Sequence, residues 1–128
     1  MPLLIATNNA HKITEITAIL QPQRLQLVTP AQRSVSLEVE ENGDTYAANA
    51  LLKAREGVRL TGLPILADDS GLEVEALGGK PGLYSSRWHG HLSQAEKNVL
   101  LVAELAKNPA APRIVRFVCT VVLVLPSG

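Results

Sequence analysis

The sequence predicts an α/β fold with a mixed central sheet flanked by helices. Short apolar segments typical of buried strands alternate with segments whose apolar residues recur at helical spacing. The chain has 128 residues, 46% hydrophobic and 19% charged, which suits one domain, residues 1–128, with a single core. Its 12 basic and 12 acidic side chains balance, so we expect no nucleic acid or membrane bound through a basic surface.

The first part of the chain predicts a strand, a helix and a second strand. Residues 3–6 are apolar and predict a buried strand, and residues 10–20 predict a helix because their apolar side chains recur every three or four positions. Residues 25–28 are consistent with a second strand. Residues 30–42 are expected to be irregular and exposed.

A second helix is expected to begin after Asp44 or Thr45, either of which can cap it, and to end near Gly62. Its small side chains recur at helical spacing, which predicts a narrow packing stripe. The residues of this stripe are Ala47, Ala50, Ala54 and Val58.

The acidic pair Asp68-Asp69 follows a predicted buried strand at residues 65–67. The segment Asp-Asp-Ser-Gly is typical of a turn, but the carboxyl end of a strand is also where open α/β sheets bind ligands. The residues alone leave both interpretations open. Residues 72–77 alternate apolar and acidic side chains, which predicts a separate, half-exposed strand.

The last third predicts a helix and a long strand. Ser93-x-x-Glu96 has the spacing of a capping box and opens a helix that is expected to end near Asn108. Residues 114–125 are rich in β-branched side chains and mostly apolar at both odd and even positions. We therefore expect this strand to be covered on both faces.

No segment is typical of a signal peptide, and the longest apolar run, residues 118–125, is too short to cross a bilayer. We therefore expect a cytoplasmic protein. Cys119 lies in this run and is expected to be a buried thiol in a reducing compartment. Residues 126–128 resemble a turn after a strand, so either the chain is a fragment or another chain covers that strand.

The loop from Thr7 to Lys12 joins the first strand to the first helix and is a candidate phosphate site. The N–H groups at a helix start attract anions, the side chains of Thr7 and Asn9 can donate to phosphate oxygens, and Lys12 adds a positive charge. The alternative is an ordinary helix cap with a surface lysine. Because the loop contains no glycine, it is neither a P-loop nor a dinucleotide-binding fingerprint.

Three other groups have alternative interpretations. A carboxylate of Asp68 or Asp69 beside a phosphate would suit Mg²⁺, which prefers oxygen ligands. The acidic cluster Glu38, Glu40 and Glu41 is either solvated surface or a source of metal ligands. One helix face is either solvated or presents an amide and an ammonium to phosphates, and its residues are Tyr46, Asn49 and Lys53. Residues without metal-ligand spacing, to which we assign no chemistry, are His11, His89 and His91.

Five segments occur in a fixed order: Ala6–Glu15, Glu40–Thr45, Asn49–Arg55, Ala67–Leu72 and Leu77–Arg87. Together they closely resemble the inosine/xanthosine triphosphate pyrophosphatase family, whose members remove non-standard purine nucleotides. The resemblance covers nearly the whole chain. It implies the N-terminal portion of the inosine triphosphate pyrophosphatase-like fold.

The resemblance also implies a Mg²⁺-dependent hydrolase that converts ITP, dITP and XTP to the monophosphate and pyrophosphate and works as a homodimer. Asp69 would bind the metal and act as general base, and Glu40, with Glu41 as the alternative, would be the other metal carboxylate. The residues that would hold the substrate are Thr7, Asn8, Asn9, Lys12, Lys53 and Ser70.

The sequence also departs from the family pattern. That pattern continues into a second lobe with a Phe-Gly-Tyr-Asp-Pro segment and a Ser-His-Arg segment, which form much of the purine pocket, and this sequence contains neither. Asn8 stands where the family often has glycine. Two functions are therefore open: a nucleotide pyrophosphatase, or a non-catalytic module that binds nucleotide or pyrophosphate or only assembles.

Overall fold

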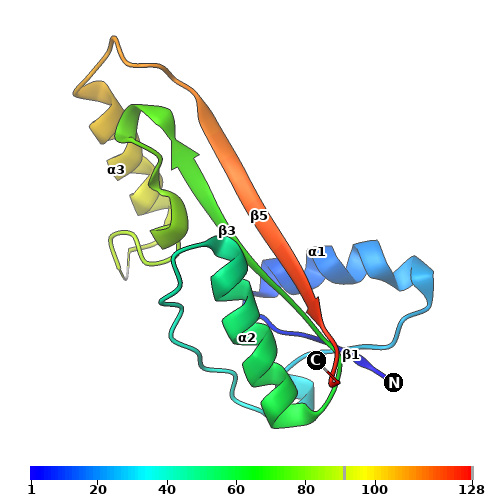
Figure 1. Ribbon diagram of the computed structural model, residues 1–128. Coiled ribbons are helices and arrows are strands. Elements are labelled where there is room, and N and C mark those ends of the chain that lie inside the picture. The colour runs from blue at the N-terminus through cyan, green and yellow to red at the C-terminus, as the bar shows by residue number, and fades with distance from the viewer. Residues whose placement is uncertain (91, 128) are drawn as a thin grey trace. The chain divides into compact units, whose positions relative to one another are not determined.

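A computed structural model describes residues 1–90 and 92–127, and its architecture is mixed α/β, as predicted (Figure 1). His91, to which the sequence assigned no chemistry, lies outside the described residues, as does Gly128. The sheet has the order β2-β1-β3-β4, and β5 also pairs with β3. The strands are β1 (Leu3–Ile5), β2 (Leu27–Val28), β3 (Ile65–Val74), β4 (Lys80–Pro81) and β5 (Val115–Val124), and the helices are α1 (Ala10–Leu20), α2 (Tyr46–Thr61) and α3 (Gln94–Ala106).

The sheet contains both parallel and antiparallel pairs. Strand β1 runs parallel to β2 and β3, with Leu4 opposite Val28 on one side and Ile65 on the other. Strand β4 runs antiparallel to β3, with Pro81 opposite Glu73. The predicted mixed sheet is therefore confirmed.

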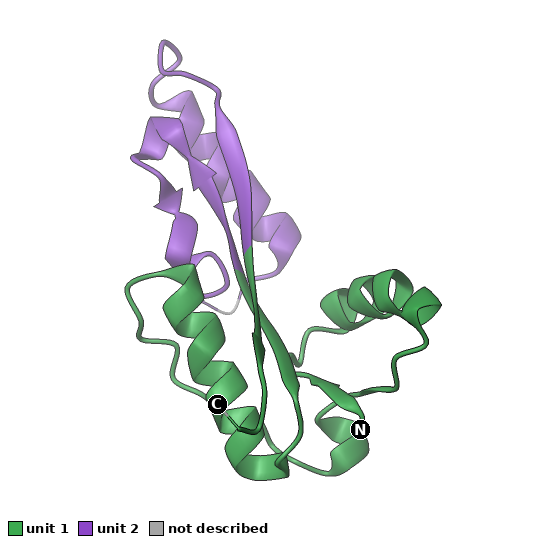
Figure 2. Ribbon diagram, turned by 45° about the vertical axis from the view of Figure 1, so that its right-hand side comes forward, with its two compact units in different colours: residues 1–69, 120–128 green, residues 70–119 purple. Residues whose placement is uncertain are grey.

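The chain forms two compact units (Figure 2). Unit 1 contains residues 1–69 and 120–128, and unit 2 contains residues 70–119. Strands β3 and β5 each contribute residues to both units. That residues 1–128 form one domain stays a prediction.

Helix α2 has the ends that its sequence predicted. The Oγ1 atom of Thr45 accepts a hydrogen bond from the N–H of Ala48 at 3.0 Å, and the left-handed Gly62, with φ of 67°, ends the helix. The packing stripe differs from the expected one, because Ala47 is exposed. The buried residues of the helix are Asn49, Ala50, Ala54 and Gly57.

The core of unit 1 joins α2 to one face of the sheet. Leu4, Ile65 and Ala54 are each fully buried in it. Leu37 is also buried there, and so is Pro30, so the expectation that residues 30–42 are exposed is wrong for these two residues. The segment is otherwise irregular apart from one short 3₁₀ turn, and its single leucine is buried because it supplies apolar area to this core.

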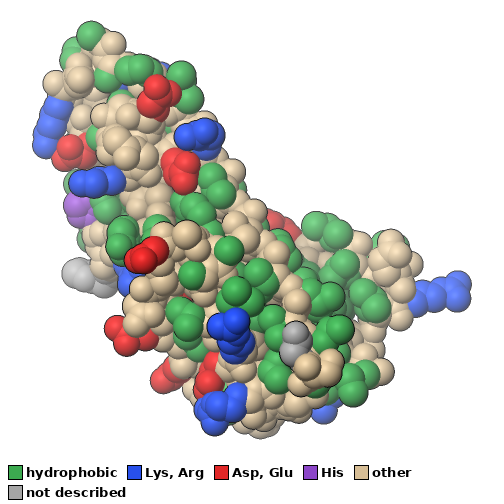
Figure 3. Space-filling model, viewed as in Figure 1, with side chains coloured by type: hydrophobic (Ala, Val, Ile, Leu, Met, Phe, Trp, Pro, Cys, Tyr) green, Lys and Arg blue, Asp and Glu red, His purple; other side chains and the backbone are tan. Residues whose placement is uncertain are grey.

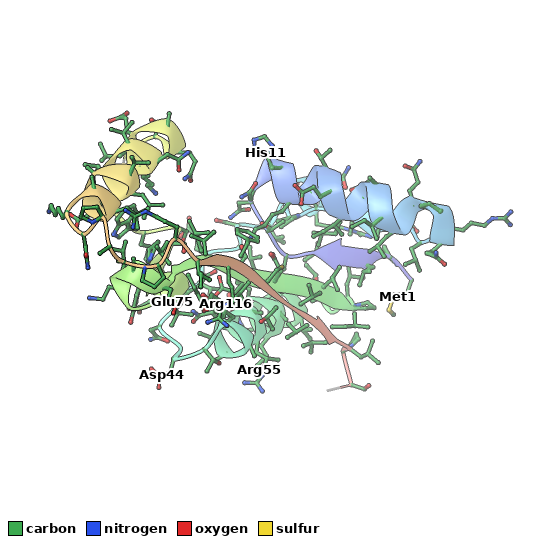
Figure 4. All side chains as sticks on the ribbon, turned by 90° about the horizontal axis from the view of Figure 1, so that it is seen from above. Met1, His11, Asp44, Arg55, Glu75 and Arg116 are labelled. Carbon is green, nitrogen blue, oxygen red and sulfur yellow. The ribbon has the colours of Figure 1, made fainter. Side chains whose placement is uncertain are left out.

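Helices α1 and α2 lie on opposite sides of the strands of unit 1, and their labelled residues His11 and Arg55 point outwards (Figure 4). Helix α1 spans the predicted residues but contributes no buried side chain. Its half-buried apolar residues are Ile13, Ile16 and Leu20, which are the ones whose spacing predicted the helix.

Strand β3 continues for 10 residues, straight through the Asp-Asp-Ser-Gly segment. The turn interpretation of this segment is therefore wrong, and so is a separate strand at residues 72–77, because residues 75–77 form a 3₁₀ turn. Aspartates favour turns when their side chains bond to nearby backbone. Asp68 and Asp69 instead bond to side chains of the two helices, so the backbone stays extended.

Unit 2 contains the third helix in its predicted place. The Oγ atom of Ser93 accepts from the N–H of Glu96 at 3.2 Å, and α3 ends at Ala106, two residues before the expected Asn108. None of the helices in the part of the chain that the structure describes is long and apolar enough to span a membrane.

Strand β5 is covered on one face only. Val122 and Val124 pack against the core of unit 1, whereas the side chains that alternate with them are exposed. The prediction of two covered faces is therefore wrong, because an apolar sequence does not itself supply a covering layer. Figure 3 shows hydrophobic side chains along the path of this strand. The exposed residues, which include the cysteine that we expected to be buried, are Val115, Phe117, Cys119, Val121 and Leu123.

Candidate functional site

In the loop before α1, polar side chains form hydrogen bonds with the backbone of the loop and of the first helical turn. Thr7 is buried, and its Oγ1 atom accepts a hydrogen bond from the N–H of Asn9 at 3.1 Å. The Oδ1 atom of Asn9 accepts from the N–H groups of His11 at 3.0 Å and Lys12 at 3.3 Å. Asn9 is therefore the N-cap of α1, as the alternative interpretation of this loop expected.

Asn8 connects the same loop to a distant segment. Asn8 is exposed, but its Nδ2 atom donates a hydrogen bond to the backbone carbonyl of Leu37 at 3.2 Å. Leu37 itself is buried in the core of unit 1. Asn8 thus anchors the loop to the core.

Lys12 reaches from α1 to strand β3. Its Nζ atom lies 2.9 Å from the Oδ2 atom of Asp68. The lysine side chain is 26% exposed and the aspartate side chain only 6%, so the carboxylate is nearly enclosed while the ammonium touches solvent. The ion pair offsets the cost of holding the Asp68 charge away from water.

Asn49 lies between strand β3 and residues 38–43, which contain Glu38, Glu40 and Glu41 and which we call the acidic segment. It is completely buried, and its Nδ2 atom donates to the Oδ2 atom of Asp69 at 3.2 Å. Its Oδ1 atom accepts from the backbone N–H of Gly43 at 2.8 Å. The interpretation of Asn49 as part of a solvated face is therefore wrong, because the residue has no exposed surface and both ends of its amide are hydrogen-bonded within the protein.

Lys53 lies one helical turn after Asn49 and reaches the same acidic segment. Its Nζ atom is 3.2 Å from the Oε1 atom of Glu41, and the lysine side chain is 14% exposed. Glu40 is exposed, and its side chain makes no ion pair or hydrogen bond with residues 1–90 or 92–127. The structure thus brings Glu41, rather than Glu40, to Lys53.

Asp68 and Asp69 point to opposite faces of β3, since successive side chains of a strand alternate. Asp68 points towards Lys12 on α1, and Asp69 points towards Asn49 on α2. Ser70, the next residue, is half-buried and belongs to unit 2. One strand therefore gives each helix of unit 1 its own carboxylate.

The model of the Ham1 family matches residues 3–128. The chain belongs to the Ham1 family. It is 45% identical over 126 residues to the dITP/XTP pyrophosphatase of Lactiplantibacillus plantarum, a match that covers 98% of this chain and 62% of that protein. The chain thus spans less than two thirds of the length of this curated relative.

Solved structures with similar sequences share the fold of this chain. A HAM1 protein from Coxiella burnetii superimposes with a TM-score of 0.85 at 34% identity, over 96% of this chain and 62% of that one. The nucleoside-triphosphatase / dITP/XTP pyrophosphatase from Mycobacterium abscessus superimposes with a TM-score of 0.78 at 40% identity, over 100% of this chain and 67% of that one.

The acidic residues of this Ham1-family chain do not form a ready-made metal cage. In residues 1–90 and 92–127, no group of three or more His, Cys, Asp or Glu side chains is arranged to hold a metal. Mg²⁺ needs no such cage, because it usually takes one or two carboxylates and completes its shell with water and phosphate oxygens. Asp69, Glu40 and Glu41 offer only oxygen donors, so their chemistry fits Mg²⁺.

Sequence reasoning missed two of the polar contacts that organise the site in this Ham1-family chain. These are the ion pair between Lys12 and Asp68 and the bridge made by Asn49. A signal for the second was present, because Asn49 lies on the same side of a helix as Ala50 and Gly57, both small residues that permit close packing. No local pattern marked the first.

Proposed function

We propose that this chain carries the phosphate-hydrolysing machinery of a pyrophosphatase that acts on ITP, dITP and XTP and releases pyrophosphate. The names of its relatives support this substrate class. The observation that carries the proposal is the arrangement around β3, where Asp68 meets Lys12 and Asp69 meets Asn49, one helical turn before Lys53. These are the groups that polyphosphate chemistry needs: ammonium groups for charge and a carboxylate for a proton.

Hydrolysis between the α and β phosphates depends on charge neutralisation and on a positioned water molecule. Lys12 and Lys53 each already lie beside a carboxylate. When substrate binds, its phosphate oxygens join these carboxylates as partners of the ammonium groups, because each ammonium has three N–H donors. Asp68, which is only 6% exposed, thus keeps its counter-ion while Lys12 contacts the phosphates.

Asp69 is the group that we assign as general base. It is 7% exposed, and the bond from Asn49 fixes one of its carboxylate oxygens. Its carboxylate takes the proton from the attacking water. Bound Mg²⁺ would be held by Asp69 and by Glu40 or Glu41, and it would neutralise charge on the phosphates.

The remaining predicted substrate ligands have supporting parts in this proposal. Thr7, Asn8 and Asn9 shape the loop beside the phosphates through the hydrogen bonds described above. Ser70 follows the general base directly in the strand and is assigned a contact with substrate.

We also propose that the chain works in the cytoplasm as a homodimer, with β5 contacting a second copy. The exposed apolar side chains Phe117, Val121 and Leu123 support this, because such surface is stabilised when another chain covers it. Light scattering at tens of micromolar is expected to give twice the monomer mass. A stable monomer would remove the proposed assembly.

The test of the proposed activity is pyrophosphate release from ITP, XTP, GTP and ATP with Mg²⁺. Asp69→Asn is expected to lower the rate with ITP and XTP about 100-fold or more, because it removes the proton acceptor. Glu15→Gln, which neutralises an exposed acid on α1, serves as the matched control and should keep the wild-type rate. Equal rates for wild type and Asp69→Asn would favour a non-catalytic module that binds nucleotide or pyrophosphate.

A further inference from the structure

We infer that Asn49 is a positioning residue. It holds the carboxylate of Asp69 and the acidic segment, both of which would supply metal ligands, at a fixed position relative to each other. The inference rests on the proposed function. Asn49 joins the two through opposite ends of one side-chain amide, at 3.2 Å to Asp69 and 2.8 Å to Gly43.

The chemistry of the two neighbours fixes the amide's orientation. A backbone N–H can only donate and an ionised carboxylate can only accept, so the oxygen of Asn49 must face Gly43 and its nitrogen must face Asp69. An aspartate at this position would satisfy Gly43 but repel Asp69, and a leucine would satisfy neither. An asparagine amide supplies both complementary ends without adding a charge.

The amide is rigidly placed by its surroundings. Asn49 has no exposed surface, and its backbone N–H donates to the carbonyl of Thr45 in the first turn of α2. At Gly43, an added Cβ atom would lie 2.8 Å from the Oδ1 atom of Asn49 and 2.8 Å from the Cβ atom of Ala48. The segment can therefore approach the amide this closely only with glycine at position 43.

A second contact fixes the same segment from the next turn of the helix. Lys53, four residues after Asn49, lies 3.2 Å from Glu41. The acidic segment is thus attached to α2 at two points, by an ion pair at Glu41 and by the buried amide at Gly43. The amide at the second point also contacts Asp69, so Asn49 ties the position of the segment to that of the base.

The test compares Asn49→Leu, which removes both hydrogen bonds at similar volume, with Asn49→Asp, which keeps only the acceptor for Gly43. Asn98→Asp, at an exposed position on α3, is the matched control. Asn49→Leu is expected to weaken Mn²⁺ binding, measured by paramagnetic resonance of the unbound ion, about 10- to 100-fold. Gly43→Ala should weaken it in the same direction, and Asn98→Asp should leave it unchanged.

Two further readouts separate positioning from mere folding. The Gly43 amide should exchange its hydrogen rapidly in Asn49→Leu but slowly in wild type and in Asn49→Asp. With saturating metal, kcat should fall about 10- to 100-fold in both Asn49 variants, while KM stays within about threefold because Lys12 and Lys53 are intact. If Asn49→Leu does not fold, Asn49→Ser, whose hydroxyl is too short to bridge the same groups, takes its place with the same expectations.

The possible outcomes distinguish this inference from the proposed function. A wild type that releases no pyrophosphate, but binds Mn²⁺ more tightly than Asn49→Leu, would refute the proposed function and support the positioning role. Equal Mn²⁺ affinity in wild type and Asn49→Leu, or no Mn²⁺ binding by wild type, would overturn the inference. The inference would also be overturned if Asn49→Leu lowered kcat, raised KM and lowered the unfolding temperature together, because that result indicates a structural role alone.

Discussion

Helices α1 and α2 of unit 1 place similar functional groups, but they differ in how many of their residues are buried. Each presents a lysine to a carboxylate, Lys12 to Asp68 and Lys53 to Glu41. Helix α1 contributes no buried residue, whereas α2 contributes four. A helix can therefore place a functional group without taking part in the core, and only α2 does both.

The largest difference from wild type is expected when either lysine loses its charge. Lys12→Met and Lys53→Met should each lower kcat for ITP about 100-fold, because each removes one preorganised cation from the phosphates. Lys12→Met should be the less stable of the two variants, because it removes the ammonium group from beside the Asp68 carboxylate, which is only 6% exposed. Lys53→Met removes the ammonium group from beside Glu41, which is 26% exposed and therefore better solvated. Steady-state kinetics and urea unfolding measure the two effects. Equal stability of the variants would contradict this account of the ion pairs.

The next prediction applies one substitution to both helices. Ala54→Leu on α2 should lower the free energy of unfolding by about 1–3 kcal/mol, because Ala54 is fully buried against the sheet. Ala18→Leu on α1, where the alanine is exposed, should change it by less than about 0.5 kcal/mol. Urea unfolding of both variants measures the difference. A comparable loss in Ala18→Leu would show that α1 is packed as tightly as α2.

The smallest expected effect concerns the exposed face of α2. The hydrogen bond from the Arg59 guanidinium lowers the pKa of the Glu56 carboxyl below its ordinary value. Ionised Glu56 therefore adds stability above the ordinary pKa of a glutamate, and this contribution disappears as the pH falls through the lowered pKa.

Thermal unfolding of wild type and Glu56→Gln at several pH values tests this effect. The wild type should be slightly more stable at neutral pH, and the two curves should meet in acid. Added salt should shrink the difference, because the pair lies at the surface, with the Arg59 side chain 68% exposed. A difference that grows in acid would have the wrong sign.

Features decided by neighbouring residues could be predicted from the sequence. The caps Thr45 and Ser93 and the stop at Gly62 all lie where local rules put them. The course of β3 could not be predicted in this way, because Asp68 and Asp69 are turn-forming residues until side chains from elsewhere in the chain bond to them. Lys12 is 56 positions before Asp68, and Asn49 is 20 positions before Asp69.

The candidate site shows the same division. The resemblance selected Lys12, Lys53 and Asp69, and the structure puts all three in or beside polar contacts of unit 1. The resemblance did not predict that Asn49 is buried, because its burial depends on the acidic segment packing against α2. Nor could the apolar pattern of β5 predict an exposed face, since periodicity reveals which side chains share a face but not what covers them.

Asp68 and Asp69 lie on opposite faces of β3, so the helix that each one meets depends on the number of residues that precede it in the strand. Deleting a single position between Ile65 and Ala67 would exchange the faces of the two carboxylates, so that each would meet the other's helix. Length changes in this stretch are thus far more damaging than most side-chain replacements. We therefore expect this stretch to tolerate a change of apolar side chain better than a change of length.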